Sequence, residues 1–187
     1  LSVGVVLVAS AGFFGGRYDQ IVMRVLDVFF AIPMTLMAIS IVAAFGNSIP
    51  NLIVAISLGQ IPKMSRIIRS SVITLKDSDF IEAARACDTP KSRIIFKHIL
   101  PNAMGTLIVE GTLTMGKSII LIAGLSFIGM GIQPPAPEWG SMLNEGRDFM
   151  QSAPWLMVYP GLAIFITVVV FNMLGDNLRD ILDPREE

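Results

Sequence analysis

Charge, cysteine and histidine are all scarce in this chain. Of its 187 residues only 16% are charged, against roughly a quarter in ordinary soluble domains, whereas 53% are apolar and the mean hydropathy is +0.67. A single cysteine, Cys87, excludes a disulfide within this sequence and any cysteine-based metal cluster. The single histidine, His98, has no further donors clustered near it, so an interface contact is expected there rather than a metal ligand. The composition predicts an integral membrane protein.

The signatures of an enzyme or a nucleic-acid-binding protein are missing as well. No constellation of serine, cysteine or carboxylate residues suggests hydrolysis, and the basic residues form no stripe interleaved with aromatics. Residues 111–118, GTLTMGKS, formally match a nucleotide-binding loop. That loop needs a strand before it and a helix after it, whereas here one apolar run extends from Met104 to Ile128. We therefore predict no catalytic residue, no metal and no cofactor bound by this chain, and no nucleic-acid partner.

Long apolar stretches divide the sequence into membrane spans, each of which needs about twenty residues. Four complete spans are predicted, with Pro62 as a kink in the second: residues 25–45, 49–68, 104–128 and 155–174. Residues 1–14 are apolar too, but about fourteen helical residues reach only ~21 Å, which is too short to cross. We expect an all-α bundle of four spans plus a partial N-terminal one, with missing upstream sequence.

Between the second and third spans, residues 78–101 form a charged, helix-forming island. Ser78 and Asp79 can each cap a helix, and Glu82 can reach back to the free amides as in a capping box. Pro90 disfavours a helical residue before it and suits the first turn of a following helix. The sequence therefore predicts a polar hairpin of two short helices joined by a turn. A polar hairpin between membrane spans needs a soluble partner.

Small side chains on the first hairpin helix suit contact with another protein. Ala83, Ala84 and Ala86 allow close approach to a groove, while Glu82 and Arg85 can pair with each other or with groove residues. The alternative is a solvated loop with good capping.

The positions of Lys and Arg predict the orientation, because cytoplasmic loops retain positive charge. Only Arg147 falls in an opposite loop. The other basic residues counted lie on one side: Arg17, Arg24, Lys63, Arg66, Arg69, Lys76, Arg85, Lys91, Arg93, Lys97, Arg179 and Arg185. The hairpin and the C-terminus are therefore predicted to be cytoplasmic.

Lys117 stands about halfway along the third predicted span, where a lysine costs a few kcal/mol unless it faces water or a polar group. We expect it either to face a water-filled translocation path or to pair with Glu110, two turns away, or with a partner subunit. Asn172 in the last span is a second candidate for the path, although interhelical hydrogen bonding suits it equally.

Several motifs together resemble a known family. The EAA element, Glu82-Ala83-Ala84, is followed by Ile99-Leu100-Pro101, as in the coupling loop of bacterial ABC importer permeases. Flanking stretches extend the resemblance over essentially the whole chain: Gly15-Gly16, Asp19, Met23-Arg24, Asp27, Ile32-Pro33, LSFIGMGIQPPAPEWGSML from Leu125, PWLMVYPGLAIF from Pro154 and FNMLGDNLRDILDP from Phe171. Together these resemble the C-type permease subunit of the oligopeptide, dipeptide and nickel uptake systems.

The resemblance implies a single transmembrane permease domain over residues 1–187, of the type I ABC importer kind and incomplete at its N-terminus. It also implies a second related permease, two ATPases that bind ATP and Mg²⁺, an extracytoplasmic binding protein, and alternating access in a bacterial plasma membrane. Where the family usually has glycine in the hairpin turn, this chain has Asp88, which tolerates left-handed dihedrals. The implied ATPase-coupling residues are Glu82, Ala83, Ala84, Arg85, Ala86, Asp88, Ile99, Leu100 and Pro101.

The proline-containing loop over residues 133–153 resembles the family segment near the receptor-docking surface, and a plain re-entry turn is the alternative. Its candidate docking residues are Glu138, Trp139, Glu145 and Arg147. A peptide is the expected cargo, with nickel chelates or another small solute as an alternative. An ion-coupled carrier or channel is a different class. Such proteins place ionisable residues or paired broken helices at mid-membrane, and here only Lys117 qualifies.

Overall fold

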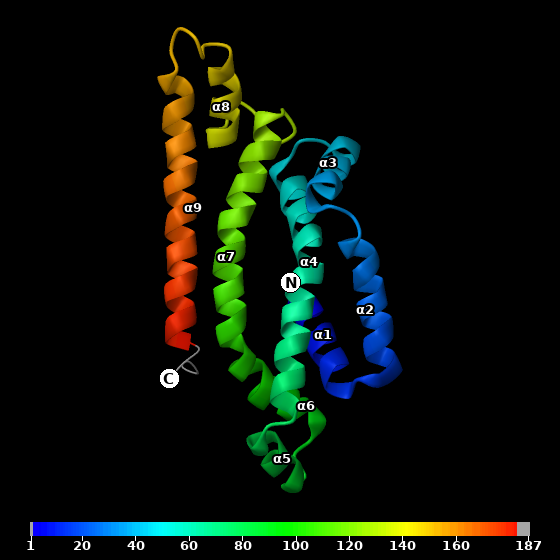
Figure 1. Ribbon diagram of the computed structural model, residues 1–187. Coiled ribbons are helices and arrows are strands. Elements are labelled where there is room, and N and C mark those ends of the chain that lie inside the picture. Colours follow the sequence, from blue (N-terminus) through cyan, green and yellow to red (C-terminus); the bar gives the residue numbers. More distant parts are fainter. Residues whose placement is uncertain (1, 183–187) are drawn as a thin grey trace. The chain divides into compact units, whose positions relative to one another are not determined.

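The computed structural model describes residues 2–182, with side chains described from Leu7 onward. Helices account for most of this part of the chain, and no strand occurs in it (Figure 1). The elements are α1 (Ser2–Phe14), α2 (Gly16–Phe30), α3 (Met34–Phe45), α4 (Ile49–Lys76), α5 (Asp79–Ala86), α6 (Lys91–Arg93), the π-helical η1 (Ile94–Ile99), α7 (Leu100–Phe127), α8 (Trp139–Arg147) and α9 (Trp155–Leu182). The all-α prediction is confirmed.

Two helices are long and apolar enough to cross a membrane by length and composition: the continuous helix Lys91–Phe127 and α9. The pair α2 and α3 would make a third only as a broken span, because the two helices are bent by 76°. The break falls at Pro33, whose missing N–H and fixed φ interrupt the helix predicted over residues 25–45. The four-span prediction is therefore not confirmed.

The second predicted span is the first part of a longer helix. α4 continues past residue 68 to Lys76 and runs through Pro62, whose side chain is fully buried. Its basic residues lower the apolar character of the helix. α4 is therefore not among the described helices that are long and apolar enough to cross a membrane.

The chain divides into two compact units. The first comprises residues 2–31, 60–110 and 178–182 of the described chain, and the second comprises residues 32–59 and 111–177. The core of the first unit packs α1 and α4 against the hairpin, through Val8, Ala9, Ile68, Val72, Ile81, Ile94, Ile95 and Ile99. The core of the second packs α3, α4 and α7 together, through Ala38, Val42, Leu52, Ala55 and Leu125. The single-domain expectation stays a prediction.

Glycines set the packing inside the second unit. A Cβ on Gly140 would lie 2.2 Å from the backbone oxygen of Ala123, so α8 rests directly on the backbone of α7. A Cβ on Gly146, six residues further on, would meet the backbone oxygen of Leu156 in α9 at 3.0 Å. The short helix α8 therefore contacts both long helices at its glycines.

Candidate functional site

The hairpin differs in two respects from the helix–turn–helix expected of residues 78–101. α5 begins at Asp79 as predicted, but Ser78 makes no side-chain cap and its hydroxyl donates to the carbonyl of Leu75 instead. The capping-box prediction is therefore wrong. The second helix is not a separate short one either, because α6, η1 and α7 run on without a break from Lys91 to Phe127.

The π-helical segment η1 lies directly before the proline of the Ile-Leu-Pro motif. The N–H of Leu100 donates to the carbonyl of Ile95, five residues back, as in a π-helix. Pro101 has no N–H to donate and its ring crowds the carbonyl four residues earlier. The wider π turns accommodate this proline within one continuous helix, so the hairpin leads directly into α7.

The turn of the hairpin is closed by a Schellman motif. The N–H of Asp88 donates to the carbonyl of Arg85 at 3.0 Å, and the N–H of Thr89 donates to the carbonyl of Ala84 at 3.1 Å. Asp88 takes φ = +54°. The motif requires this left-handed conformation at the residue after the C-cap, where glycine is the usual choice. The expectation that Asp88 can fill the turn of the hairpin is confirmed.

One face of the hairpin is part of the core of its own unit. Ile81 and Ile99 are fully buried, and Ala84 packs against the same cluster. Arg85 turns toward this side as well. Its guanidinium donates to the carbonyl of Lys76 at 3.2 Å and lies 5.7 Å from the ring centre of Phe13.

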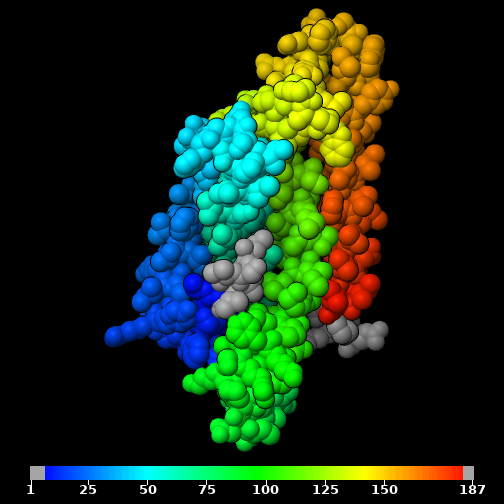
Figure 2. Space-filling model, turned by 180° about the vertical axis from the view of Figure 1, so that it is seen from behind, coloured from blue at the N-terminus to red at the C-terminus, as the bar shows by residue number. Residues whose placement is uncertain are grey.

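The other face of the hairpin is exposed, and Figure 2 shows the hairpin in green as a lobe standing out beyond the blue helices of its own unit. Glu82 makes no ion pair with Arg85 in the described structure, contrary to one alternative of the sequence analysis. Of the predicted coupling residues, those with exposed side chains other than Arg85 are Glu82, Ala83, Ala86, Asp88 and Pro101, and Leu100 is half-buried.

Two aromatic residues on the hairpin were missed by the sequence analysis. Phe80 is 43% exposed and Phe96 is 54% exposed. The sequence contained a signal for these two contact candidates. An aromatic side chain in a charged segment between membrane spans has no lipid to face, which favours contact with another protein.

Behind the hairpin, α4 presents three basic residues at intervals of three, and each pairs with a carboxylate of the first unit. Lys63 pairs with Glu110 of α7, and Arg66 pairs with Asp27 of α2 at 2.7 Å. Arg69 holds Asp19 of α2 with two hydrogen bonds. The sequence analysis used all three only in counting the basic residues on one side of the membrane and predicted no carboxylate partner for any of them.

Arg66 makes a second contact. Its guanidinium carbon lies 3.9 Å from the ring centre of Phe30, so one arginine holds both an acidic and an aromatic residue of α2. With the Arg69–Asp19 pair, this contact fixes α2 to α4 at two levels.

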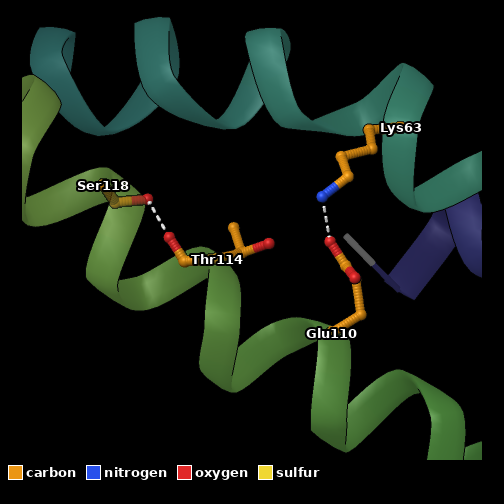
Figure 3. Close-up of polar contacts among 4 residues, drawn as sticks. All are labelled: Lys63, Glu110, Thr114 and Ser118. Carbon is orange, nitrogen blue, oxygen red and sulfur yellow. Dashed lines mark hydrogen bonds and ion pairs between the residues drawn. The ribbon is translucent and has the colours of Figure 1, made fainter. Parts of the chain in front are cut away.

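Lys117 and Asn172 lie in the second unit. The side chain of Lys117 is exposed on α7 and forms no ion pair in the described part of the chain. Glu110 is bound by Lys63 instead (Figure 3), so the alternative that Lys117 pairs with Glu110 is wrong. Asn172 on α9 places its Oδ1 3.4 Å from the position of a Cβ on Gly116 of α7.

The stretch that imitates a nucleotide-binding loop is helical throughout, since residues 111–118 fall inside α7. Their backbone amides are held in the helix ladder, where no phosphate can reach them. Within residues 2–182, no three His, Cys, Asp or Glu residues gather where they could hold a metal ion.

The loop after the third predicted span holds a helix that the sequence analysis did not predict. Glu138 caps α8, because its Oε2 accepts the N–H of Ser141 at 2.8 Å. The Ser141 hydroxyl donates back to the carbonyl of Glu138 at 2.8 Å. Trp139 is 39% exposed, and Glu145 and Arg147 are exposed too. The loop therefore contains a helix, and docking of a binding protein there stays a prediction.

The fold and the hairpin define an all-helical membrane protein. Its polar hairpin connects α4 to the long helix that continues as α7. A model of the family described as "Binding-protein-dependent transport system inner membrane component" matches residues 4–187. The chain belongs to this family, so the resemblance inferred from its motifs is confirmed.

Two curated relatives illustrate the relationship. Over 182 residues the chain is 46% identical to the dipeptide transport system permease protein DppC of Alkalihalophilus pseudofirmus, covering 97% of this chain and 60% of that protein. Over 185 residues it is 45% identical to the glutathione transport system permease protein GsiD of Pectobacterium atrosepticum, covering 99% and 62%. The chain thus spans about three fifths of the length of these relatives.

A solved structure shows the same fold. The chain is similar to a chain of the MetNI methionine ABC transporter in an inward-facing conformation, with a TM-score of 0.68 over 96% of this chain and 91% of that one. The sequence identity is 17%, so this likeness concerns the fold alone.

Proposed function

We propose that this chain is the membrane-spanning part of a permease subunit in an ATP-driven, binding-protein-dependent importer of di- or oligopeptides. The observation that carries the proposal is the match of nearly the whole chain to relatives named as dipeptide and glutathione permeases. The chain itself does no chemistry. ATP and Mg²⁺ bind to two separate ATPase subunits, and a second related permease completes the translocation path.

The hairpin is the element that couples ATP hydrolysis to transport in this proposal. Its buried face, with Ile81 and Ile99, joins it to α1 and α4, so the hairpin moves with the unit on which it is mounted. Its exposed face, with Glu82, Ala83 and Ala86, is free to enter a groove of an ATPase. Closure of the ATPases on ATP pushes this lever and converts an outward-facing path into an inward-facing one.

The remaining site assignments follow from the same proposal. The protein lies in the bacterial plasma membrane with the hairpin and the C-terminus in the cytoplasm. The extracytoplasmic binding protein docks on α8, at Glu138, Trp139, Glu145 and Arg147. Lys117 faces the translocation path, and Asn172 lies beside it.

Cysteine cross-linking tests the coupling role. In full-length protein with Cys87→Ser, Ala83→Cys is expected to cross-link to an ATPase subunit of the assembled transporter, because Ala83 is exposed on the outer face. The matched control is Ala84→Cys, one residue further on, which packs against the core of the first unit and is expected to cross-link far less. Equal capture at both positions, or capture at neither, would count against the proposed docking face.

A further inference from the structure

The helix α7 carries polar side chains along one face, although it belongs to a segment apolar enough to cross a membrane. Glu110, Thr114 and Ser118 follow one another at intervals of four, which places them on the same face of the helix. Polar and ionisable side chains on a spanning helix avoid lipid and mark paths for solutes.

The charged end of this face is an ion pair between two helices. The ammonium of Lys63 on α4 contacts the Oε1 of Glu110 on α7 (Figure 3). The lysine side chain is 43% exposed and the glutamate side chain 18% exposed. Water or a small solute can therefore reach both charges without unfolding either helix. One turn along α7 from Glu110, Thr114 accepts the hydroxyl of Ser118 at its carbonyl oxygen at 2.9 Å.

We propose that Lys63 and Glu110 form an exchangeable binding site for the two charged ends of a zwitterionic peptide. The carboxylate of Glu110 takes the α-ammonium of the peptide, and the ammonium of Lys63 takes its α-carboxylate. This inference rests on the proposed function, since it presumes a peptide as the cargo.

The electrostatics of such a path favour an exchangeable pair. A peptide that leaves water brings two charges into an apolar protein, which is costly unless each charge meets a partner. An empty site with one lone charge would carry the same penalty. When Lys63 and Glu110 bind each other in the empty state and the peptide in the loaded state, no charge is left alone in either state.

Peptides with one charged end blocked, tested in variants that lack one charge of the site, examine the proposal in the complete transporter. The probes are dialanine, N-acetyl-dialanine and dialanine amide, and each uptake rate in a variant is divided by the parent's rate for the same peptide. Any preference of the other subunits for one peptide over another is the same in the variant and the parent, so it cancels in this ratio.

Loss of one charged hydrogen bond is expected to lower uptake about tenfold. Lys63→Met should therefore lower the uptake of dialanine and N-acetyl-dialanine, which keep the carboxylate, and spare the amide. Glu110→Gln should lower the uptake of dialanine and the amide, which keep the ammonium, and spare the acetylated peptide.

Two controls separate recognition from a purely structural ion pair. Arg66→Met removes a neighbouring ion pair of α4 and should change all three uptake ratios by the same factor. The double variant Lys63→Met, Glu110→Gln leaves no lone charge, so a purely structural ion pair predicts that dialanine uptake recovers. Recognition of the peptide charges predicts that dialanine uptake stays low while the transporter assembles normally. If the double variant recovers parental uptake, or if the single variants affect all three peptides equally, the inference is wrong. A parent transporter that imports no peptide would instead refute the proposed function.

Discussion

Arg69 binds both carboxylate oxygens of Asp19 with two of its three donor nitrogens. The Nε of Arg69 donates to Oδ1 of Asp19 at 2.7 Å, and a terminal guanidinium nitrogen donates to Oδ2 at 2.6 Å. The Asp19 side chain is only 10% exposed, while that of Arg69 is 34% exposed. This bidentate pair joins α2 to α4 across 50 positions of sequence and belongs to the strong class of ion pairs.

The unequal exposure of the two partners predicts unequal effects of removing them. Arg69→Met leaves a mostly buried carboxylate without its partner and should destabilise the protein by about 3 kcal/mol. Asp19→Asn leaves an arginine that already reaches water, and should cost only about 1 kcal/mol. Thermal unfolding of the purified, detergent-solubilised transporter measures both. Equal losses in the two variants would contradict the asymmetry.

The left-handed residue in the hairpin turn predicts a stabilising substitution. Asp88 sits at φ = +54°, where a residue with a Cβ is strained by about 1 kcal/mol relative to glycine. Asp88→Gly should raise the midpoint of thermal unfolding, Asp88→Asn should leave it nearly unchanged, and the β-branched Asp88→Val should lower it. A valine variant as stable as the parent would show that the turn does not require this conformation.

The close contact of α8 with α7 predicts that Gly140 cannot be replaced by a residue with a side chain. An alanine Cβ at Gly140 would meet the backbone of Ala123 at 2.2 Å, and backbone cannot move aside as a side-chain tip can. Gly140→Ala should therefore cost about 3 kcal/mol or more. The matched control is Gly111→Ala in α7, where nothing lies within 4 Å of the new Cβ and a gain of up to about 1 kcal/mol is expected.

The retained yield of folded protein and the midpoint of thermal unfolding report both glycine variants. Similar behaviour of the two would mean that α8 does not rest on the α7 backbone.

The exposed thiol of Cys87 predicts the sidedness of the hairpin. A membrane-impermeant maleimide should label this position in inside-out vesicles and leave it unlabelled in intact cells, since the proposed orientation puts the hairpin in the cytoplasm. Cys87→Ser identifies any labelling at other cysteines of the full-length protein. Cys87-dependent labelling in intact cells would reverse the orientation and remove the basis for ATPase coupling.

Lys117 predicts a second effect on charged cargo, independent of the site at Lys63. If Lys117 faces the path, Lys117→Met should lower the uptake of peptides with a free carboxylate relative to amidated ones, whereas Lys117→Arg should keep the parental ratio. The measurement is the ratio of the two uptake rates in each variant. An unchanged ratio in Lys117→Met would place this lysine outside the path.

Local features of the structure were largely predictable from the sequence. The helical class, the start of α5 at Asp79 and the turn at Asp88 each depend on a few neighbouring residues, and short-range preferences decide them. The break at Pro33 has a local cause too, but the apolar run on both sides of it concealed the proline in the prediction of one span over residues 25–45.

The ion pairs were not predictable in this way. A lysine near a span boundary has the same sequence signature whether it stays in a loop or finds a carboxylate. The alternative that paired Lys117 with Glu110 came from considering the third predicted span alone, because the residue that binds Glu110 lies 47 positions away on α4.

By itself, the sequence determined that this is a helical membrane protein of the binding-protein-dependent permease family, with a polar hairpin between apolar segments. Composition, hydropathy and short motifs suffice for that, since they act through solvent and through neighbouring residues. Only the tertiary structure decided that Arg85 donates to the carbonyl of Lys76 while Ala83 stays exposed, and that Lys63 pairs with Glu110. Those outcomes depend on which helices pack together, and packing brings together side chains that no local pattern relates.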